Sequence, residues 1–116
     1  MEDLKMCPKF ESAFEILGKR WTGLIIRAML SGCHRFGVLS DMIPQLSDRM
    51  LVQRLKELEA SGIVKRNVYP ETPVRIEYEL TEKGRELEAV MNQVQIWADR
   101  WIKEDSEEMK YGRRGK

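Results

Sequence analysis

Residues 47–58 read Ser-Asp-Arg-Met-Leu-Val-Gln-Arg-Leu-Lys-Glu-Leu and predict a helix with two chemically different sides. Ser47 is a favourable N-cap, and Asp48 complements the positive end of the helix dipole. At about 100° per residue, one side of the helix carries three apolar side chains, those of Leu51, Leu55 and Leu58. We therefore expect this side to pack on a core, with Ser61 and Gly62 ending the helix.

The opposite side of the same helix carries Arg49, Gln53 and Lys56. Arginine and glutamine bond guanine and adenine bidentately, and lysine reaches guanine or a phosphate. Because recognition helices read base edges with their N-terminal residues, we expect Arg49 and Gln53 to read bases and Lys56 to hold a phosphate. Met50 and Ser47 border this side and belong to the same expected DNA-binding set. Taken alone, an ordinary solvated face is an equal alternative.

The flanking sequence predicts a winged helix-turn-helix, an α+β fold that is mainly helical. Helical spacing of apolar residues predicts three earlier helices, over residues 8–17, 21–30 and 36–43. The inner face of the second is expected to carry Leu24, Ile25, Ala28 and Met29. Alternation predicts two strands, over residues 63–69 and 74–80, around the turn 70–73. Thr81 is the expected N-cap of a last, continuous helix that runs to about residue 102.

The hairpin strengthens the DNA-binding interpretation, because a β-ribbon beside a basic helix commonly follows the adjacent minor groove or backbone. Arg75 lies near its turn, with Lys65 and Arg66 behind it. Three further cations flank the starts of the second and third helices and are expected to hold phosphates, namely Lys19, Arg20 and Arg35.

The distribution of charge agrees with this interpretation better than the total does. The 116 residues carry a net charge of +1, but residues 18–66 carry nine Lys and Arg against four Asp and Glu. Local cations are what displace counterions from phosphates. With 42% hydrophobic residues, no long apolar run, no signal-like start and two cysteines, the sequence predicts one cytoplasmic domain without a membrane segment. Its core spans about residues 7–102, followed by a polar tail over 103–116.

The last predicted helix carries an apolar stripe that is long for so small a domain. Its members recur at intervals of three and four residues, and they are Leu87, Val90, Met91, Val94, Trp97, Ala98 and Trp101. Because the middle helices offer too little surface to cover it, we expect a second copy of the chain to do so. Phe10 and Phe14 of the first helix are expected to join this dimer interface.

Cys7 is the candidate reactive residue. It precedes Pro8 at a helix N-terminus, where free N–H groups and the helix dipole favour a thiolate, and Lys5 and Lys9 add positive potential. A thiolate attacks quinones, oxidants and other electrophiles. Cys33 is expected to be a packed residue, and one Cys33-His34 pair does not supply the four ligands of a zinc site. We expect no metal and no cofactor.

Several motifs together resemble those of the HxlR-type winged helix-turn-helix regulators, and they run in the expected order over about residues 7–100. They are Cys7-Pro8, Gly18–Thr22, Arg35-Phe36, Ile43-Pro44, Met50–Glu59, Gly62–Val64, Tyr69–Val74 and Tyr78–Gly84. The surroundings of Cys7 look like those in the quinone- and electrophile-sensing repressors of that family. The resemblance implies a homodimeric repressor on a palindromic operator, with Cys7 as its redox-sensing cysteine.

The chain departs from some of these relatives because no cysteine follows Cys33. The resemblance then implies either a Cys7–Cys7 disulfide between subunits or alkylation of Cys7. One alternative is a small ligand in the dimer groove in place of thiol chemistry, and another is a winged-helix module that binds protein only. A cysteine-dependent enzyme fits less well, because the sequence has no CxxC, no second histidine and no glycine-rich phosphate loop.

Overall fold

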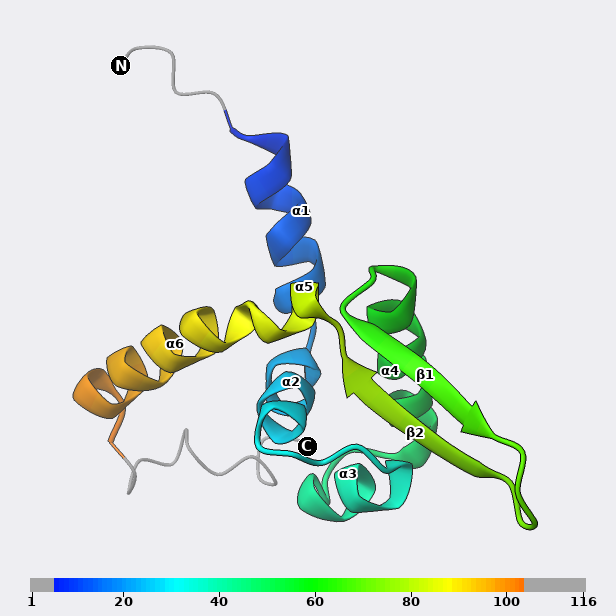
Figure 1. The fold of residues 1–116 in the computed structure, drawn as a ribbon. Helices are drawn as coiled ribbons and strands as arrows, with labels where there is room; N and C mark the ends of the chain where they lie inside the picture. Colours follow the sequence, from blue (N-terminus) through cyan, green and yellow to red (C-terminus); the bar gives the residue numbers. More distant parts are fainter. Residues whose placement is uncertain (1–5, 104–116) are drawn as a thin grey trace.

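Helix α4 (Asp48–Ala60) lies behind the two strands in Figure 1, and it is the helix that residues 47–58 predict. The computed structural model describes residues 6–103. Ser47 caps the helix, since its Oγ accepts a hydrogen bond of 3.1 Å from the backbone N–H of Met50. Leu51, Leu55 and Leu58 are at most 1% exposed, so the predicted apolar side does face the core.

The predicted order of elements is confirmed. Besides α4, the elements in chain order are α1 (Pro8–Leu17), α2 (Thr22–Leu30), α3 (Phe36–Met42), β1 (Val64–Tyr69), β2 (Arg75–Leu80), α5 (Glu82–Arg85) and α6 (Leu87–Trp101). The two strands pair antiparallel from Val64 opposite Leu80 to Tyr69 opposite Arg75, and we call this hairpin the wing. Lys5 lies outside the described residues. Of the expected polar tail over residues 103–116, only Lys103 is described.

The core lies between α2, α3 and α4 and is closed by the base of the wing. Its fully buried side chains include Ile25, Ile26, Leu39 and Val64. The expected inner face of α2 is wrong in one position, because Leu24 is exposed and Ile26 is buried instead. Leu24 lies one turn before Arg27, whose guanidinium faces α6 and bonds Asn92 and Gln95.

The predicted last helix begins as expected but is not continuous. Thr81 caps α5, with its Oγ1 accepting a hydrogen bond of 3.1 Å from the N–H of Gly84. The backbone at Glu86 has a ψ of −14°, well short of the helical value near −42°, and it separates α5 from α6. Arg85 donates a hydrogen bond of 2.7 Å to the carbonyl of Leu80, which holds α5 against the end of β2.

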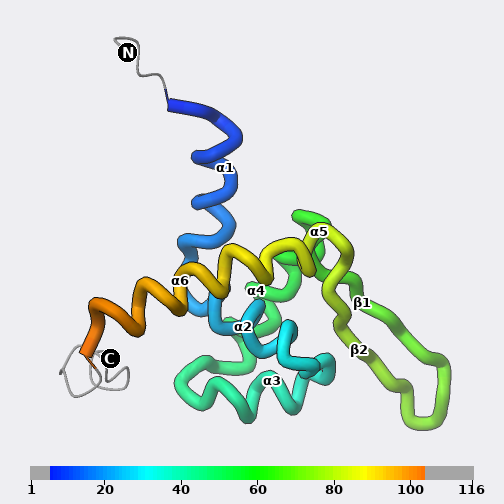
Figure 2. Tube along the Cα trace, turned by 60° about the vertical axis from the view of Figure 1, so that its left-hand side comes forward, coloured from blue at the N-terminus to red at the C-terminus, as the bar shows by residue number. Residues whose placement is uncertain are grey.

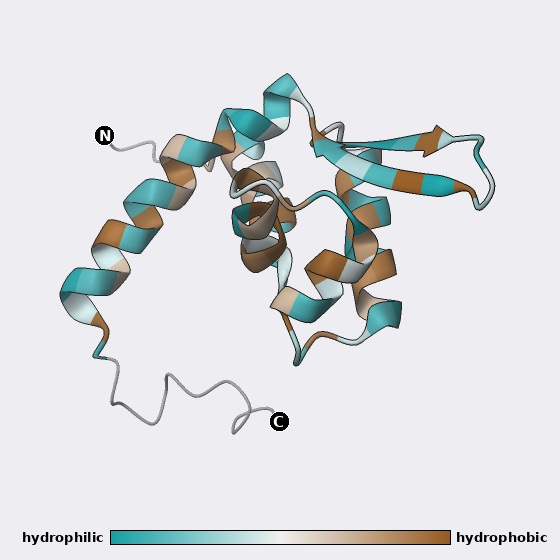
Figure 3. Ribbon diagram, turned by 60° about the horizontal axis from the view of Figure 1, so that its bottom comes forward, coloured by the Kyte–Doolittle hydropathy of each residue, from teal (hydrophilic) through white to brown (hydrophobic). Residues whose placement is uncertain are grey.

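Helices α1 and α6 extend away from this body in different directions (Figures 1 and 2). The radius of gyration is 16.3 Å, whereas a compact chain of about 100 residues has roughly 13 Å. Hydrophobic residues recur along the exposed length of α6 (Figure 3). The two arms therefore carry apolar surface that the body of the same chain does not cover. Within residues 6–103, no helix has the length and apolar character needed to cross a membrane.

Glu57, near the end of α4, joins this helix to the corner between α1 and α2. Its carboxylate accepts a hydrogen bond of 2.9 Å from Gln53 and lies 3.3 Å from Lys19 Nζ and 3.2 Å from Arg54 Nη1. Arg54 in turn donates from Nε to the carbonyl of Arg20, at 2.9 Å. The bond from Gln53, with the nearby cations, lowers the pKa of Glu57.

We predict that Glu57→Gln makes the free energy of unfolding less dependent on pH in the acidic range. A carboxyl group whose pKa is lower in the folded state stabilises the protein above its unfolded pKa, and this contribution disappears as the pH falls through the folded value. Between about pH 5 and pH 3, the wild type should lose more unfolding free energy than the variant. Urea denaturation across this range measures it. Glu59→Gln, on the same helix, is the control, and equal pH profiles for the wild type and Glu57→Gln would contradict the assignment.

We predict that Gly84→Ala destabilises the protein by roughly 1–3 kcal/mol. A Cβ at position 84 would collide with the backbone carbonyl of Ile63 and lie 2.9 Å from Leu80 Cδ2. Gly37→Ala is the control, because its Cβ would meet nothing within 4 Å and alanine favours a helix by up to about 1 kcal/mol. Thermal unfolding of both variants tests this, and a Gly84→Ala protein as stable as Gly37→Ala would show that the contact yields.

Candidate nucleic-acid interface and thiol site

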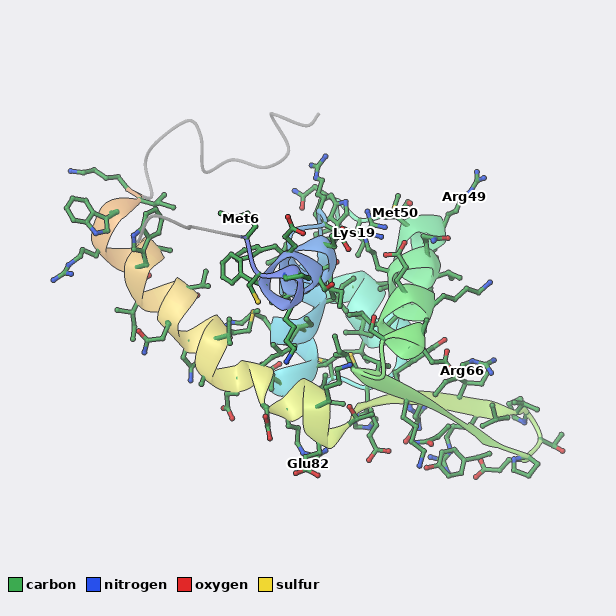
Figure 4. The ribbon with its side chains drawn as sticks, turned by 90° about the horizontal axis from the view of Figure 1, so that it is seen from above. Met6, Lys19, Arg49, Met50, Arg66 and Glu82 are labelled. Atoms are coloured by element: carbon green, nitrogen blue, oxygen red, sulfur yellow. The ribbon has the colours of Figure 1, made fainter. Side chains whose placement is uncertain are left out.

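The exposed side of α4 carries Arg49, Gln53 and Lys56, opposite the three leucines. In Figure 4 the Arg49 side chain extends beyond the end of α4, away from the body of the molecule. Within residues 6–103, neither Arg49 nor Lys56 takes part in an ion pair or a side-chain hydrogen bond. Both cations are thus available to an anionic partner, and we call this surface the α4 face.

Gln53 is less free than its two neighbours on the α4 face. Its Nε2 donates to Glu57, which also holds Lys19, so two expected DNA contacts share one carboxylate. Met50 is half-buried and packs against the core, which leaves it at the edge of the face. The Ser47 hydroxyl is occupied as the cap acceptor.

Arg20 lies at the corner where α2 begins. Its guanidinium carbon lies 4.4 Å from the ring centroid of Trp21, which is the N-cap residue of α2 with a left-handed φ of 79°. The Arg20 side chain remains exposed, while its carbonyl is the acceptor for Arg54. The corner places this cation and Lys19 close to the end of α4 that carries Glu57.

Arg75 is held within the wing and does not extend from it. Its Nη1 donates to Glu77 at 2.6 Å, its Nη2 donates to Glu71 at 2.9 Å, and its guanidinium stacks 4.1 Å from the Tyr69 ring centroid. The hydrogen bonds from Arg75 lower the pKa of Glu71. Glu77 also lies 3.6 Å from Arg35 Nε, so two predicted DNA contacts, Arg75 and Arg35, are charge-paired in the free protein.

Sequence reasoning missed the three carboxylates that hold these cations, Glu57, Glu71 and Glu77. A signal was present for two of them: Gln53 and Glu57 are four residues apart on a helix, and Arg75 and Glu77 lie on the same face of a strand. The bond between Glu71 and Arg75 spans the turn, however, and the link between Arg35 and Glu77 joins segments 42 residues apart in the sequence. The residues of each of these two pairs come together only in the folded chain.

The arms carry a second surface, which we call the apolar arm surface. Its members are Phe10, Phe14, Val90, Val94, Trp97 and Trp101, all exposed, with Trp97 at 59% and Trp101 at 64%. The rings of Phe10 and Phe14 are 5.1 Å apart. Met91 does not belong to it, contrary to expectation, because it is 8% exposed and packs in the core of its own chain, where half-buried Leu87 also packs.

Cys7 is the N-cap residue of α1, directly before Pro8. Its side chain is exposed and makes no cap hydrogen bond, although its carbonyl accepts from the N–H of Glu11 at 3.1 Å. The thiol therefore lies at the positive end of a helix dipole and is open to reagents from solution.

Cys33 is half-buried, as a packed residue should be. Its Sγ lies 2.9 Å from Met42 Sδ, and the residue lines a cavity of about 490 Å³ between the end of α2 and the wing. His34 also lines this cavity, with Nδ1 2.8 Å from the carbonyl of Gly32. Over the part of the chain that the structure describes, no group of three His, Cys, Asp or Glu side chains is placed to hold a metal.

Comparisons with known proteins agree with this architecture. The model of the HxlR-like helix-turn-helix family matches residues 16–106. YvaP of Bacillus subtilis (strain 168), an uncharacterised HTH-type transcriptional regulator, is 51% identical over 102 residues, which cover 88% of this chain and 94% of YvaP. YodB of the same organism, also an HTH-type transcriptional regulator, is 55% identical over 96 residues, 83% of this chain and 86% of YodB.

Solved structures of two regulators are similar in fold. Reduced YodB has a TM-score of 0.75 at 54% identity and covers 85% of this chain and 97% of its own. YodB has also been solved after diamide treatment and with bound quinone, each with a TM-score of 0.71. The redox regulator HypR in its oxidised form has a TM-score of 0.76 at 38% identity, covering 84% of this chain and 99% of its own.

These relatives are transcriptional regulators and not enzymes, which agrees with the prediction from the α4 face and the wing. The family model covers most of the chain, and the relatives match over nearly their whole length. With its capped helix α4, its wing and this likeness, the chain belongs to the HxlR family of DNA-binding helix-turn-helix transcriptional regulators.

Proposed function

We propose that this regulator is a homodimeric repressor that binds a palindromic operator through α4 and releases it when Cys7 is oxidised or alkylated. The observation that carries operator reading is the division of α4 into a buried leucine side and an exposed side with Arg49, Gln53 and Lys56. A helix held in this way presents donors and acceptors to a major groove. Arg20 and Lys19 are the flanking phosphate contacts in this proposal.

The proposed dimer covers the apolar arm surface with a second copy of the chain. Two tryptophans that are more than half exposed, beside an apolar groove lined by Val90, Val94 and Trp97, are costly to leave in water. Pairing through α1 and α6 would set the spacing of two α4 helices, which must match a whole number of DNA turns. Cys7 is the N-cap residue of α1, so a modification there would act next to the proposed dimer interface that sets this spacing.

The proposed chemistry at Cys7 follows two balanced routes. Addition of the thiolate to a quinone forms one carbon–sulfur bond, and the electron pair moves to the ring oxygens, which take up protons to give a hydroquinone thioether. Diamide oxidises two Cys7 thiols, one from each subunit, to a disulfide, and accepts their two electrons and two protons as a hydrazine. The quinone-bound and diamide-treated forms of YodB support both reagents as probes for this chain.

We predict that Arg49→Ala lowers affinity for a duplex selected by the wild-type protein from a random pool by about 1–3 kcal/mol, and relaxes the preference at one base position. Fluorescence anisotropy at fixed salt measures the affinity. Arg100→Ala, which removes an exposed arginine from the last turn of α6, is the control and should bind as the wild type does. Equal affinities for the wild type and Arg49→Ala would contradict the role of α4.

We predict that Cys7→Ser binds the selected duplex but no longer releases it after benzoquinone or diamide. Removal of the nucleophile prevents both the thioether and the disulfide. The control is Cys33→Ser, which should release DNA as the wild type does. Anisotropy and a non-reducing gel provide the readouts. Release that persists in Cys7→Ser would indicate a small ligand in the dimer groove instead of thiol chemistry.

A further inference from the structure

Glu77 connects the wing to the first segment of the helix-turn-helix. Its side chain is 17% exposed, and its Oε2 accepts a hydrogen bond of 2.6 Å from Arg75 Nη1 on β2. The same oxygen lies 3.6 Å from Nε of Arg35, the N-cap residue of α3. One partly buried carboxylate therefore joins two arginines that come from separate elements.

A backbone hydrogen bond reinforces this connection. The N–H of Tyr78 in β2 donates to the carbonyl of His34 at 2.8 Å, next to Arg35. Farther along, Ser40 of α3 donates to Asp48 in the first turn of α4 at 2.7 Å. A continuous set of contacts thus runs from the wing through α3 to the start of the reading helix.

The tip of the wing has a separate lock that does not need Glu77. Arg75 also bonds Glu71 and stacks on Tyr69, and both of these partners belong to the hairpin. Loss of the Glu77 carboxylate would leave these contacts of the tip in place and remove the charged link between β2 and Arg35. The two functions of Arg75 are therefore separable by substitution.

We infer that Glu77 is a specificity-determining positioning residue: it holds the wing in one position relative to α3 and α4, and it keeps Arg35 and Arg75 from binding phosphates of any sequence. The inference rests on the proposed operator binding. Specificity is a difference of affinities, so a carboxylate that neutralises two cations in the unbound protein weakens non-specific binding most. An operator that is aligned with the wing makes additional contacts, and these compensate for the neutralisation of Arg35 and Arg75.

The test compares Glu77→Gln with Glu79→Gln. Glu79 lies two residues away on the same face of β2 and is exposed. Its carboxylate accepts a hydrogen bond of 2.7 Å from the Asn67 amide and, among residues 6–103, pairs with no cation. Both variants lose one negative charge, so any difference between them reports the position of that charge. The measured quantity is the ratio of Kd for a scrambled duplex to Kd for the selected duplex, at one salt concentration.

We expect the ratio to fall about tenfold in Glu77→Gln, with scrambled-duplex affinity rising roughly three- to tenfold, and to stay within about twofold in Glu79→Gln. Hydrogen exchange at the Tyr78 amide should become faster in Glu77→Gln only. An equal change in both variants, an unchanged ratio in Glu77→Gln, or a parallel loss of both affinities would overturn the inference.

Glu77→Asp is the second variant, because it keeps the charge but shortens the side chain by one methylene. It should lower the ratio several-fold without strengthening scrambled-duplex binding, and an unchanged ratio would count against the positioning role even if Glu77→Gln fails to fold. The wild-type ratio is measured first. No preference in the wild type would overturn the proposed function and this inference together, whereas a normal preference that Glu77→Gln retains overturns the inference alone.

Discussion

Burial of Leu51, Leu55 and Leu58 in the core determines how α4 is oriented and which of its side chains face solvent. Each buried leucine side chain contributes about 1.5–3 kcal/mol, so a rotation of α4 that exposed them would cost several kcal/mol. The orientation of α4 about its own axis is therefore set by its apolar side, and its polar side faces solvent as a consequence. The DNA reading that we propose would follow from core packing, because the same rotation fixes where Arg49 points.

Nearby carboxylates then affect how strongly the cations of that polar surface can bind phosphate. Glu57 and Glu77 each hold cations that sequence alone assigns to DNA, whereas Arg49 carries no such partner within the described part of the chain. A regulator whose net charge is only +1 can still concentrate cations on one surface and limit their non-specific use with nearby carboxylates. In the function that we propose, base reading by Arg49 and phosphate binding by the paired cations therefore depend on different contacts.

Residue type and periodicity predicted the features that depend on neighbours in sequence. These are the caps at Ser47 and Thr81, the leucine side of α4 and the hairpin. These local patterns failed where contacts between distant segments determine the structure. The apolar run at residues 24–26 does not show which side of α2 faces the core. The close approach of Gly84 in α5 to the backbone carbonyl of Ile63 involves residues that are 21 apart in the sequence. The stripe on the last helix likewise gave no sign that Met91 belongs to the core. The ion pair between Arg35 and Glu77 required the fold.

Hydroxyl-radical footprinting on the selected duplex tests most directly the central claim, that two copies of the chain present two α4 helices to successive major grooves. The account predicts two protected half-sites related by a dyad, with centres separated by a whole number of helical turns, roughly 34–36 Å each. A single protected segment without dyad symmetry, at protein concentrations that saturate the duplex, would contradict it.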